Sequence, residues 1–343
     1  MMSEPPFELG PIRPPAEARS LLIRTTRGCP WNRCDFCTNY RQMRFSLRSV
    51  EEIKEDIRRA ARYYHGYPFQ SCFLQDGDSF IMLTDQLVEV LRFLKEQFPS
   101  LERVSSYGRA HTMVRKSLEE MREICQAGLN RLYCGLESGS DEVLTYIHKG
   151  ATAADMIRAG QMAREAGMEV SEFVIMGIGG RKLWRVHAVE TARVLNAIDP
   201  HFIRVRSLGV KEGSPLEDKV YRGEFEIPSE EEIIVEQRLL LEGLDGIGSY
   251  YSNDHSVNLL MEVEGRLPDD KPAMLATLDR YLALSPAEKT HFAVGRRLGD
   301  YARLDDMHDV SLRQRVEQKQ VELTFRYPGQ LEEIFHYVRS QII

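Results

Sequence analysis

The chain has 343 residues, of which 43% are hydrophobic and 28% are charged, so it can bury a full core and is not a disordered protein. Its 45 Lys and Arg against 52 Asp and Glu give a net charge of −7, without the basic excess typical of general nucleic-acid or anionic-membrane binders. The sequence shows no apolar leader and no uncharged run of about 18 residues. We therefore expect a cytoplasmic protein that does not span a membrane.

The first 19 residues contain five prolines, which disfavour regular hydrogen bonding and predict an extended N-terminal arm over 1–19. From residue 20 onward, apolar strand patterns alternate with helical ones. The first helix is expected after a capping-box pattern formed by Ser49 and Glu52. The expected strands cover 21–26, 71–75, 103–107, 131–136, 168–176 and 201–208, and the expected helices cover 49–65, 84–98, 117–127, 140–148, 153–166 and 187–197.

Six successive strand–helix units predict a parallel α/β sheet with right-handed crossovers over residues 20–215. After about residue 215 the pattern predicts helices only, at 229–243, 271–284 and 286–300 and over a charged stretch at 308–341. We therefore expect a mainly helical C-terminal region over 216–343.

Strand alternation turns some charged side chains away from the helices. In the sixth strand, Ile203 and Val205 are expected against the helices, so that Arg204 and Arg206 face the opposite side of the sheet. Guanidinium groups there suit a polar, anionic ligand. The alternative is that these charges lie at strand ends in solvent.

Three cysteines follow the first strand within nine residues: Cys29, Cys34 and Cys37. Three thiolates on one loop can hold three irons of a [4Fe–4S] cluster and leave the fourth iron open. A zinc site with a fourth ligand from elsewhere, or thiols without a metal, remain alternatives. The other three cysteines lie on apolar faces and are expected in the core.

These features resemble the radical S-adenosylmethionine (radical SAM) superfamily over residues of about 20–210. The resemblance implies a partial (β/α)6 TIM-like barrel with a C-terminal helical extension, whose cluster loop follows the first strand. Phe36 supplies the aromatic that the family places before the last cysteine. The gap between the first two cysteines is four residues here, where the family usually has three.

The resemblance also implies the positions that bind S-adenosylmethionine, each after a successive strand. The segment after the second strand would hold the methionyl amino group, the one after the fourth strand the ribose, and the one after the fifth strand the adenine. Glycines in such segments allow the backbone to approach a flat ring. The matching residues are Asp76, Gly77 and Asp78, then Glu137 and Ser138, then Met176 and Gly177. An ordinary Asp-Gly turn and a helix cap are the alternatives for the first two segments.

The implied activity is reductive cleavage of S-adenosylmethionine to a 5′-deoxyadenosyl radical, which abstracts hydrogen from a small polar substrate. The resemblance extends to the group that includes oxygen-independent coproporphyrinogen III oxidase-like proteins. It implies an electron donor such as a flavodoxin or ferredoxin. One competing hypothesis is a radical SAM enzyme that modifies RNA or peptide, although the acidic net charge disfavours RNA. The other is a binding protein without catalysis, whose fold is stabilised by zinc or by a cluster.

Overall fold

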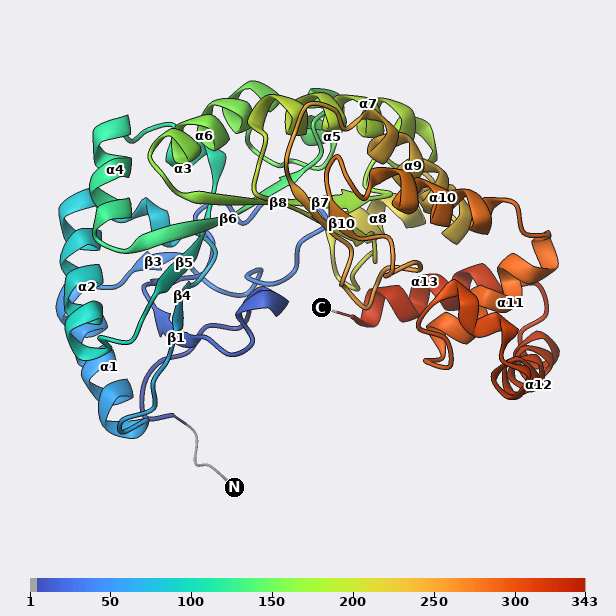
Figure 1. Ribbon diagram of the computed structural model, residues 1–343, viewed down its shortest axis with the longest axis horizontal. Helices are drawn as coiled ribbons and strands as arrows, with labels where there is room; N and C mark the ends of the chain where they lie inside the picture. Colours follow the sequence, from blue (N-terminus) through green and yellow to red (C-terminus); the bar gives the residue numbers. More distant parts are fainter. Residues whose placement is uncertain (1–4, 343) are drawn as a thin grey trace. The chain divides into compact units, whose positions relative to one another are not determined.

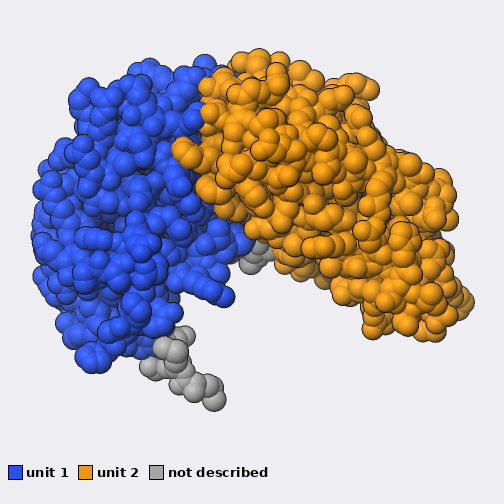
Figure 2. All heavy atoms as spheres, viewed as in Figure 1, with its two compact units in different colours: residues 1–135, 150–172 blue, residues 136–149, 173–343 orange. Residues whose placement is uncertain are grey.

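The computed structural model describes residues 5–342, which form two compact units (Figure 2). Unit 1 comprises Met1–Gly135 and Gly150–Glu172, and unit 2 comprises Leu136–Lys149 and Phe173–Ile343. No helix among the described residues is both long and apolar enough to cross a membrane.

One eight-stranded sheet and one two-stranded sheet make up the β-structure (Figure 1). The order in the larger sheet is β1-β4-β5-β6-β7-β8-β9-β10, and β2 pairs with β3. The neighbours from β1 to β6 are parallel, β8 and β9 are parallel, and β9 and β10 are antiparallel. The strands are β1 (Leu21–Arg24), β2 (Thr26–Arg27), β3 (Ser46–Leu47), β4 (Ser71–Gln75), β5 (Arg103–Gly108), β6 (Leu129–Glu137), β7 (Glu169–Met176), β8 (Phe202–Ser207), β9 (Tyr250–Ser252) and β10 (Gly265–Arg266).

The helices of unit 1 pack side by side in chain order, α1 on α2, α2 on α4 and α4 on α6 (Figure 1). In unit 2, α9 packs on both α7 and α10. The helices are α1 (Val50–Tyr63), α2 (Thr84–Gln97), α3 (Ala110–Met113), α4 (Leu118–Gln126), α5 (Asp141–Tyr146), α6 (Ala153–Glu165), α7 (Gly180–Ile198), α8 (Pro215–Tyr221), α9 (Glu230–Gly243), α10 (Lys271–Leu282), α11 (Pro286–Arg297), α12 (Val310–Arg326) and α13 (Leu331–Gln341), with short 3-10 helices η1 (Pro15–Glu17), η2 (Ser79–Ile81) and η3 (Leu304–His308).

The predicted α/β class is confirmed, and the local sequence explains where several elements begin. The capping box predicted from Ser49 and Glu52 is present, with the Ser49 hydroxyl accepting from the Glu52 amide at 3.2 Å. In β4, Cys72, Phe73 and Leu74 are all fully buried, as expected of a parallel strand that is covered on both faces. Cys72 and Cys134 are buried as predicted, whereas Cys125 is half-buried.

The predicted architecture needs four corrections. The sheet has eight strands rather than six, because β9 and β10 continue it beyond β8, so the expectation of helices only after residue 214 was wrong. Helices α3 and α8 and strand β3 were not predicted, and α7 begins at Gly180 rather than at 187. The single helix expected over 308–341 is broken into α12 and α13, because Pro328 cannot donate a backbone hydrogen bond and Gly329 adopts a φ of +75°.

The described part of the N-terminal segment lies on unit 1. The Gln75 side chain accepts from the Gly10 amide at 2.9 Å and donates to the Ile12 carbonyl at 2.9 Å. Further along, the carboxylate of Glu17 is fully buried and accepts a hydrogen bond from the Tyr133 hydroxyl at 2.6 Å. Residues 5–19 thus make contacts within unit 1 and include the 3-10 helix η1, so this part is not extended throughout, whereas residues 1–4 lie outside the described residues.

Candidate cluster loop and cofactor segments

The cysteine loop of unit 1 connects β2 to β3, so the antiparallel pairing of these strands holds both of its ends. Cys29, Cys34 and Cys37 are half-buried, and none forms a disulfide. Arg41 restrains the loop from within, because its guanidinium donates to the Cys34 carbonyl at 2.7 Å and to the Cys37 carbonyl at 3.0 Å. Phe36 is half-buried in the same loop.

The donor set of this loop fits an iron–sulfur cluster. Among residues 5–342, no three His, Cys, Asp or Glu side chains are already gathered as a metal site. Three half-exposed thiols nevertheless share one short loop, and thiolate is the ligand that iron–sulfur clusters require. The hydroxyl of Tyr40 is buried beside them without a hydrogen-bond partner among the described residues, which leaves a polar atom available to a bound group.

Gly77 lies in the segment after the second predicted strand, and it places that segment against the cysteine loop. Its amide donates to the Gly28 carbonyl at 3.3 Å. A Cβ at position 77 would lie 3.1 Å from the Cβ of Cys29 and 3.1 Å from the Tyr40 ring. A side chain at this position would therefore push against the first cysteine, which explains a glycine here.

Asp76 belongs to a buried ion pair. Its Oδ2 accepts from the Arg24 Nε at 3.0 Å and from the Gly28 amide at 2.9 Å. Burial raises the pKa of Asp76, although both of these donors and the Arg24 charge oppose that rise. Its Oδ1 lies so close to Gly10 that a Cβ there would collide with it. Asp76 thus contacts both the N-terminal segment and the start of the cysteine loop and can hold the two together.

Asp78 is also buried, and its Oδ1, like that of Asp76, has no hydrogen-bond partner among the described residues, so the two carboxylates differ at Oδ2. The Thr112 hydroxyl donates to Oδ2 at 2.6 Å, whereas Oδ1 is buried without a hydrogen-bond partner among the described residues. Burial raises the pKa of Asp78 to about 6, against the opposing effects of Thr112 and Arg109. An unpartnered carboxylate oxygen can accept a proton donor such as an ammonium group.

Unit 2 contains the predicted ribose segment at the end of β6. Glu137 adopts a φ of +60° and pairs with the Lys149 ammonium at 3.0 Å. Ser138 is fully buried, and its hydroxyl lies 2.8 Å from Nδ1 of His187 on α7. The next amide, of Gly139, donates to the Thr191 hydroxyl at 2.8 Å.

The predicted adenine segment, at the end of β7, is also in unit 2. Met176 is fully buried, and Gly177 adopts a φ of +87°. The Gly177 amide donates to Oε2 of Glu236 on α9 at 2.5 Å. Sequence reasoning identified neither Glu236 nor His187, and the only available signal was a polar residue at a buried helix position.

The predicted arginines lie on β8 of unit 2. Arg204 is buried, its guanidinium lies 5.4 Å from the centre of the Phe202 ring, and Nη1 is 3.4 Å from the Ser252 hydroxyl. The Ser252 hydroxyl in turn donates to Asp254 at 2.9 Å. Arg206 is half-buried on the same strand. Strand β9 thus supplies polar neighbours of Arg204 that the sequence did not reveal.

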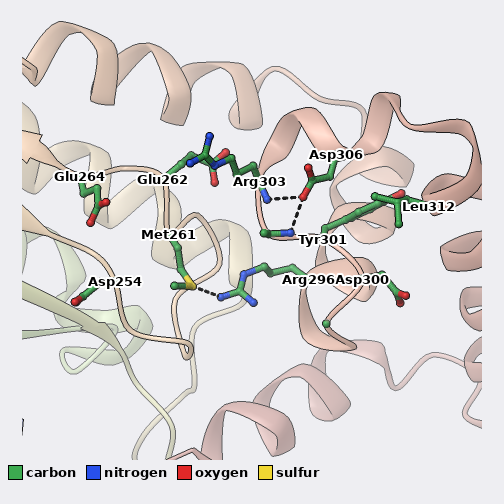
Figure 3. A pocket seen from close by; sticks show the side chains of 12 residues that line it. Asp254, Met261, Glu262, Glu264, Arg296, Asp300, Tyr301, Arg303, Asp306 and Leu312 are labelled. Carbon is green, nitrogen blue, oxygen red and sulfur yellow. Dashed lines mark hydrogen bonds between the residues drawn. The ribbon is translucent and has the colours of Figure 1, made fainter. Parts of the chain in front are cut away.

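A separate hollow of about 460 Å³ lies in unit 2 between the segment after β9 and the C-terminal helices (Figure 3). Arg296 and Met261 approach each other across it. Asp254, which also lies 3.9 Å from Arg204, forms part of the wall.

The predicted site residues fall into two groups, with the cysteines, Phe36 and positions 76–78 in unit 1 and the remainder in unit 2.

Comparison with known proteins identifies the class. Residues 23–192, about half of the chain, match the model of the radical SAM superfamily. A segment of 158 residues is 27% identical to an uncharacterized methyltransferase of Pyrococcus horikoshii, covering 46% of this chain and 32% of that protein. Another of 170 residues is 27% identical to biotin synthase of Magnetococcus marinus, covering 48% of this chain and 50% of that protein. The chain thus spans about a third to a half of these relatives.

A solved structure with a similar fold was also found. The structure of coproporphyrinogen III oxidase from Escherichia coli, a radical SAM enzyme, aligns with a TM-score of 0.51 at 16% identity, covering 68% of this chain and 55% of that one. This likeness agrees with the predicted fold class. The chain belongs to the radical SAM superfamily, whose enzymes use a [4Fe–4S] cluster and S-adenosylmethionine.

Proposed function

We propose that this protein reductively cleaves S-adenosylmethionine and uses the product radical to abstract hydrogen from a small polar substrate. The observation that carries the proposal is the cysteine loop, in which Cys29, Cys34 and Cys37 share one segment whose ends are paired as β2 and β3. When bound, the cluster and S-adenosylmethionine supply the electron transfer and the carbon–sulfur cleavage that generate the 5′-deoxyadenosyl radical.

In unit 1, the chain's own residues would hold the cluster and the amino group of S-adenosylmethionine. The three thiolates would ligate iron, and Arg41 keeps the backbone between Cys34 and Cys37 in one conformation. The buried Oδ1 of Asp78 suits an ammonium group, so we assign Asp78 to the methionyl amino group. Asp76 keeps its pairing with Arg24 and positions the segment.

In unit 2, Glu137 and Ser138 are the candidates for the ribose hydroxyls, and Met176 and Gly177 for the adenine. Gly177 has no side chain, so it can adopt its positive φ and can let the backbone at the end of β7 approach a flat ring closely. Arg204 and Arg206 on β8 are candidates for a carboxylate of the substrate or of S-adenosylmethionine, because guanidinium pairs with carboxylate.

The net charge of −7 favours a small substrate over RNA. The chemistry also needs a one-electron donor, for which a flavodoxin or ferredoxin is the expected partner. A methyltransferase is the alternative that the Pyrococcus horikoshii relative's name suggests. Detection of a methylated product rather than of 5′-deoxyadenosine release alone would favour that alternative.

The deciding experiment measures 5′-deoxyadenosine released from S-adenosylmethionine by anaerobically reconstituted protein with dithionite. We expect the parent protein to release it and a variant with alanine at all three cysteines to release none and to lose its iron and its absorbance near 400 nm. If protein isolated from anaerobic cells contains zinc without iron and cleaves no S-adenosylmethionine, the proposal is wrong. The protein is then a binding protein stabilised by a metal.

A further inference from the structure

Two residues outside the predicted motifs connect the two segments of unit 2 that we assign to the nucleoside of S-adenosylmethionine. His187 on α7 contacts the segment at the end of β6, and Glu236 on α9 contacts the segment at the end of β7. Both side chains are buried, with exposed fractions of 0% and 1%. An ionisable side chain is rarely buried this completely unless it interacts with another polar group.

His187 fixes the β6 segment. Its Nδ1 lies 2.8 Å from the Ser138 hydroxyl and 3.4 Å from that of Thr191, which itself accepts from the Gly139 amide. The backbone of α7 comes so close here that a Cβ on Gly139 would collide with the Glu190 carbonyl. Side chain and backbone of α7 therefore hold the same two consecutive residues.

Glu236 fixes the β7 segment. Its Oε2 accepts the Gly177 amide at 2.5 Å, and a Cβ at position 177 would lie 3.5 Å from each of Ile233 and Pro228. These neighbours are apolar, so they offer the Gly177 amide no other hydrogen-bond acceptor if the carboxyl group of Glu236 is removed. The Gly177 amide would then be buried without an acceptor.

The two side chains also meet each other. Nε2 of His187 lies 3.9 Å from Oε1 of Glu236, and neither atom has a hydrogen-bond partner among the described residues. Burial lowers the pKa of His187 to about 3 and raises the pKa of Glu236 well above its ordinary value. Both groups are thus favoured in their neutral forms, and at 3.9 Å the two atoms are neighbours without a direct hydrogen bond.

We propose that His187 and Glu236 form one positioning pair, which holds Ser138 and Gly177 in the conformation that binds the nucleoside of S-adenosylmethionine. This inference rests on the proposed function and extends it to α9, an element of the C-terminal region. The pair itself touches no reacting atom, and it acts through the two segments that it holds.

The test measures the dissociation constant of S-adenosylmethionine by calorimetry on anaerobically reconstituted protein, alongside the melting temperature. His187→Leu and Glu236→Leu are each expected to weaken binding about tenfold or more, because each leaves a buried polar group unpaired. The double variant is expected to weaken binding by less than the product of the two single effects. Val194→Ala, a buried apolar truncation on α7, controls for general loss of stability and should change the melting temperature alone.

Polar replacements of similar size keep the test decisive if the leucine variants do not fold. His187→Asn places an amide near the position of Nδ1, toward Ser138, and should bind S-adenosylmethionine within about threefold of the parent protein. His187→Gln places its amide near the position of Nε2 and should bind as weakly as His187→Leu. Equal binding by the Asn and Gln variants, or parent-like binding by folded leucine variants, would overturn the inference.

Hydrogen exchange separates this inference from the proposed function. In protein without S-adenosylmethionine, the amides of 136–140 and 175–180 should exchange faster in both leucine variants than in Val194→Ala. If the parent protein does not cleave S-adenosylmethionine, the proposed function fails, and exchange still decides whether the pair holds the two segments. Unchanged exchange in both segments would refute the pair even in an enzyme that cleaves S-adenosylmethionine.

Discussion

Asp78 shows how the surroundings of one residue set its chemistry. Asp76 and Asp78 are both fully buried and only two residues apart, and Oδ1 of each lacks a hydrogen-bond partner among the described residues. They differ at Oδ2, which accepts from the Arg24 guanidinium in Asp76 and from the Thr112 hydroxyl in Asp78. The sequence predicted both as ligands, because it shows the residue types and their order but not which carboxylate is already paired. The difference follows from Arg24, which lies 52 positions away in sequence.

The raised pKa of Asp78 predicts a specific dependence of stability on pH. The folded protein takes up a proton at this group near pH 6, whereas an unfolded chain does so near pH 4. Asp78 therefore lowers the free energy of unfolding above pH 6, and this effect disappears as the pH falls toward 4. We expect the free energy of unfolding of Asp78→Asn to exceed that of the parent protein by up to about 3 kcal/mol at pH 7 and by almost nothing at pH 4.

Urea unfolding at the two pH values measures this difference. Asp269→Asn, at an exposed position, is the control and should change the free energy of unfolding by the same small amount at both pH values. An advantage of Asp78→Asn that is independent of pH would show that its carboxyl is not the group responsible.

At the scale of elements, the cysteine loop depends on the connection between α5 and α6. Gly150, in that connection, adopts a φ of +72°, and a Cβ there would collide with the indole ring of Trp31. The guanidinium groups of Arg33 and Arg109 lie 5.3 and 5.5 Å from the same ring. Trp31 was missed as a structural residue, because sequence alone does not show which distant glycine makes room for it.

Gly150→Ala should therefore disturb the cluster loop. A left-handed conformation costs alanine about 1 to 2 kcal/mol, and displacement of Trp31 should add about 1 to 3 kcal/mol. Gly66→Ala is a matched control, because Gly66 has a φ of +76° with nothing within 4 Å of its added Cβ. We expect lower iron content after reconstitution and altered Trp31 fluorescence, measured in a Trp184→Phe background, only for Gly150→Ala. Equal effects of the two substitutions would rule out the contact with Trp31 as the cause.

Elements with local signals could be predicted, and those that depend on distant partners could not. The helices α1 and α9 begin at Ser-x-x-Glu patterns, whose reciprocal hydrogen bonds involve only four neighbouring residues. Strand β9, by contrast, has three residues and exists because β8 lies beside it, with Phe202 opposite Tyr250. Such a short segment contains no periodicity of its own, so its pairing was missed.

At the scale of the whole molecule, three helices of the C-terminal region meet at one buried charge cluster. Glu230 at the start of α9 lies 2.6 Å from Arg297 of α11 and 3.0 Å from Arg339 of α13, and all three side chains are at most 2% exposed. Burial alone would raise the pKa of Glu230, but the two arginines outweigh it and hold that pKa below its ordinary value.

Glu230→Gln should cost about 3 to 5 kcal/mol of unfolding free energy at pH 7, because it leaves two buried arginines uncompensated. The adjacent Glu231→Gln, which removes a half-exposed ion pair with Lys289, should cost less than about 1 kcal/mol. Because the folded pKa of Glu230 is lowered, its advantage exists above the ordinary glutamate value of about 4.3 and fades below it. Thermal unfolding at pH 7 and pH 4 measures both effects, and equal losses for the two substitutions would contradict the buried cluster.

The division into units has a consequence for biosynthesis. Residues 136–149 belong to unit 2 but leave the ribosome before the last part of unit 1, which ends at residue 172. Their partners His187 and Thr191 emerge about 40 to 55 residues later, so the hydrogen bonds of Ser138 and Gly139 to α7 can form only after that helix has been synthesised. The segment at the end of β6 therefore stays without these partners while the last part of unit 1 is being synthesised.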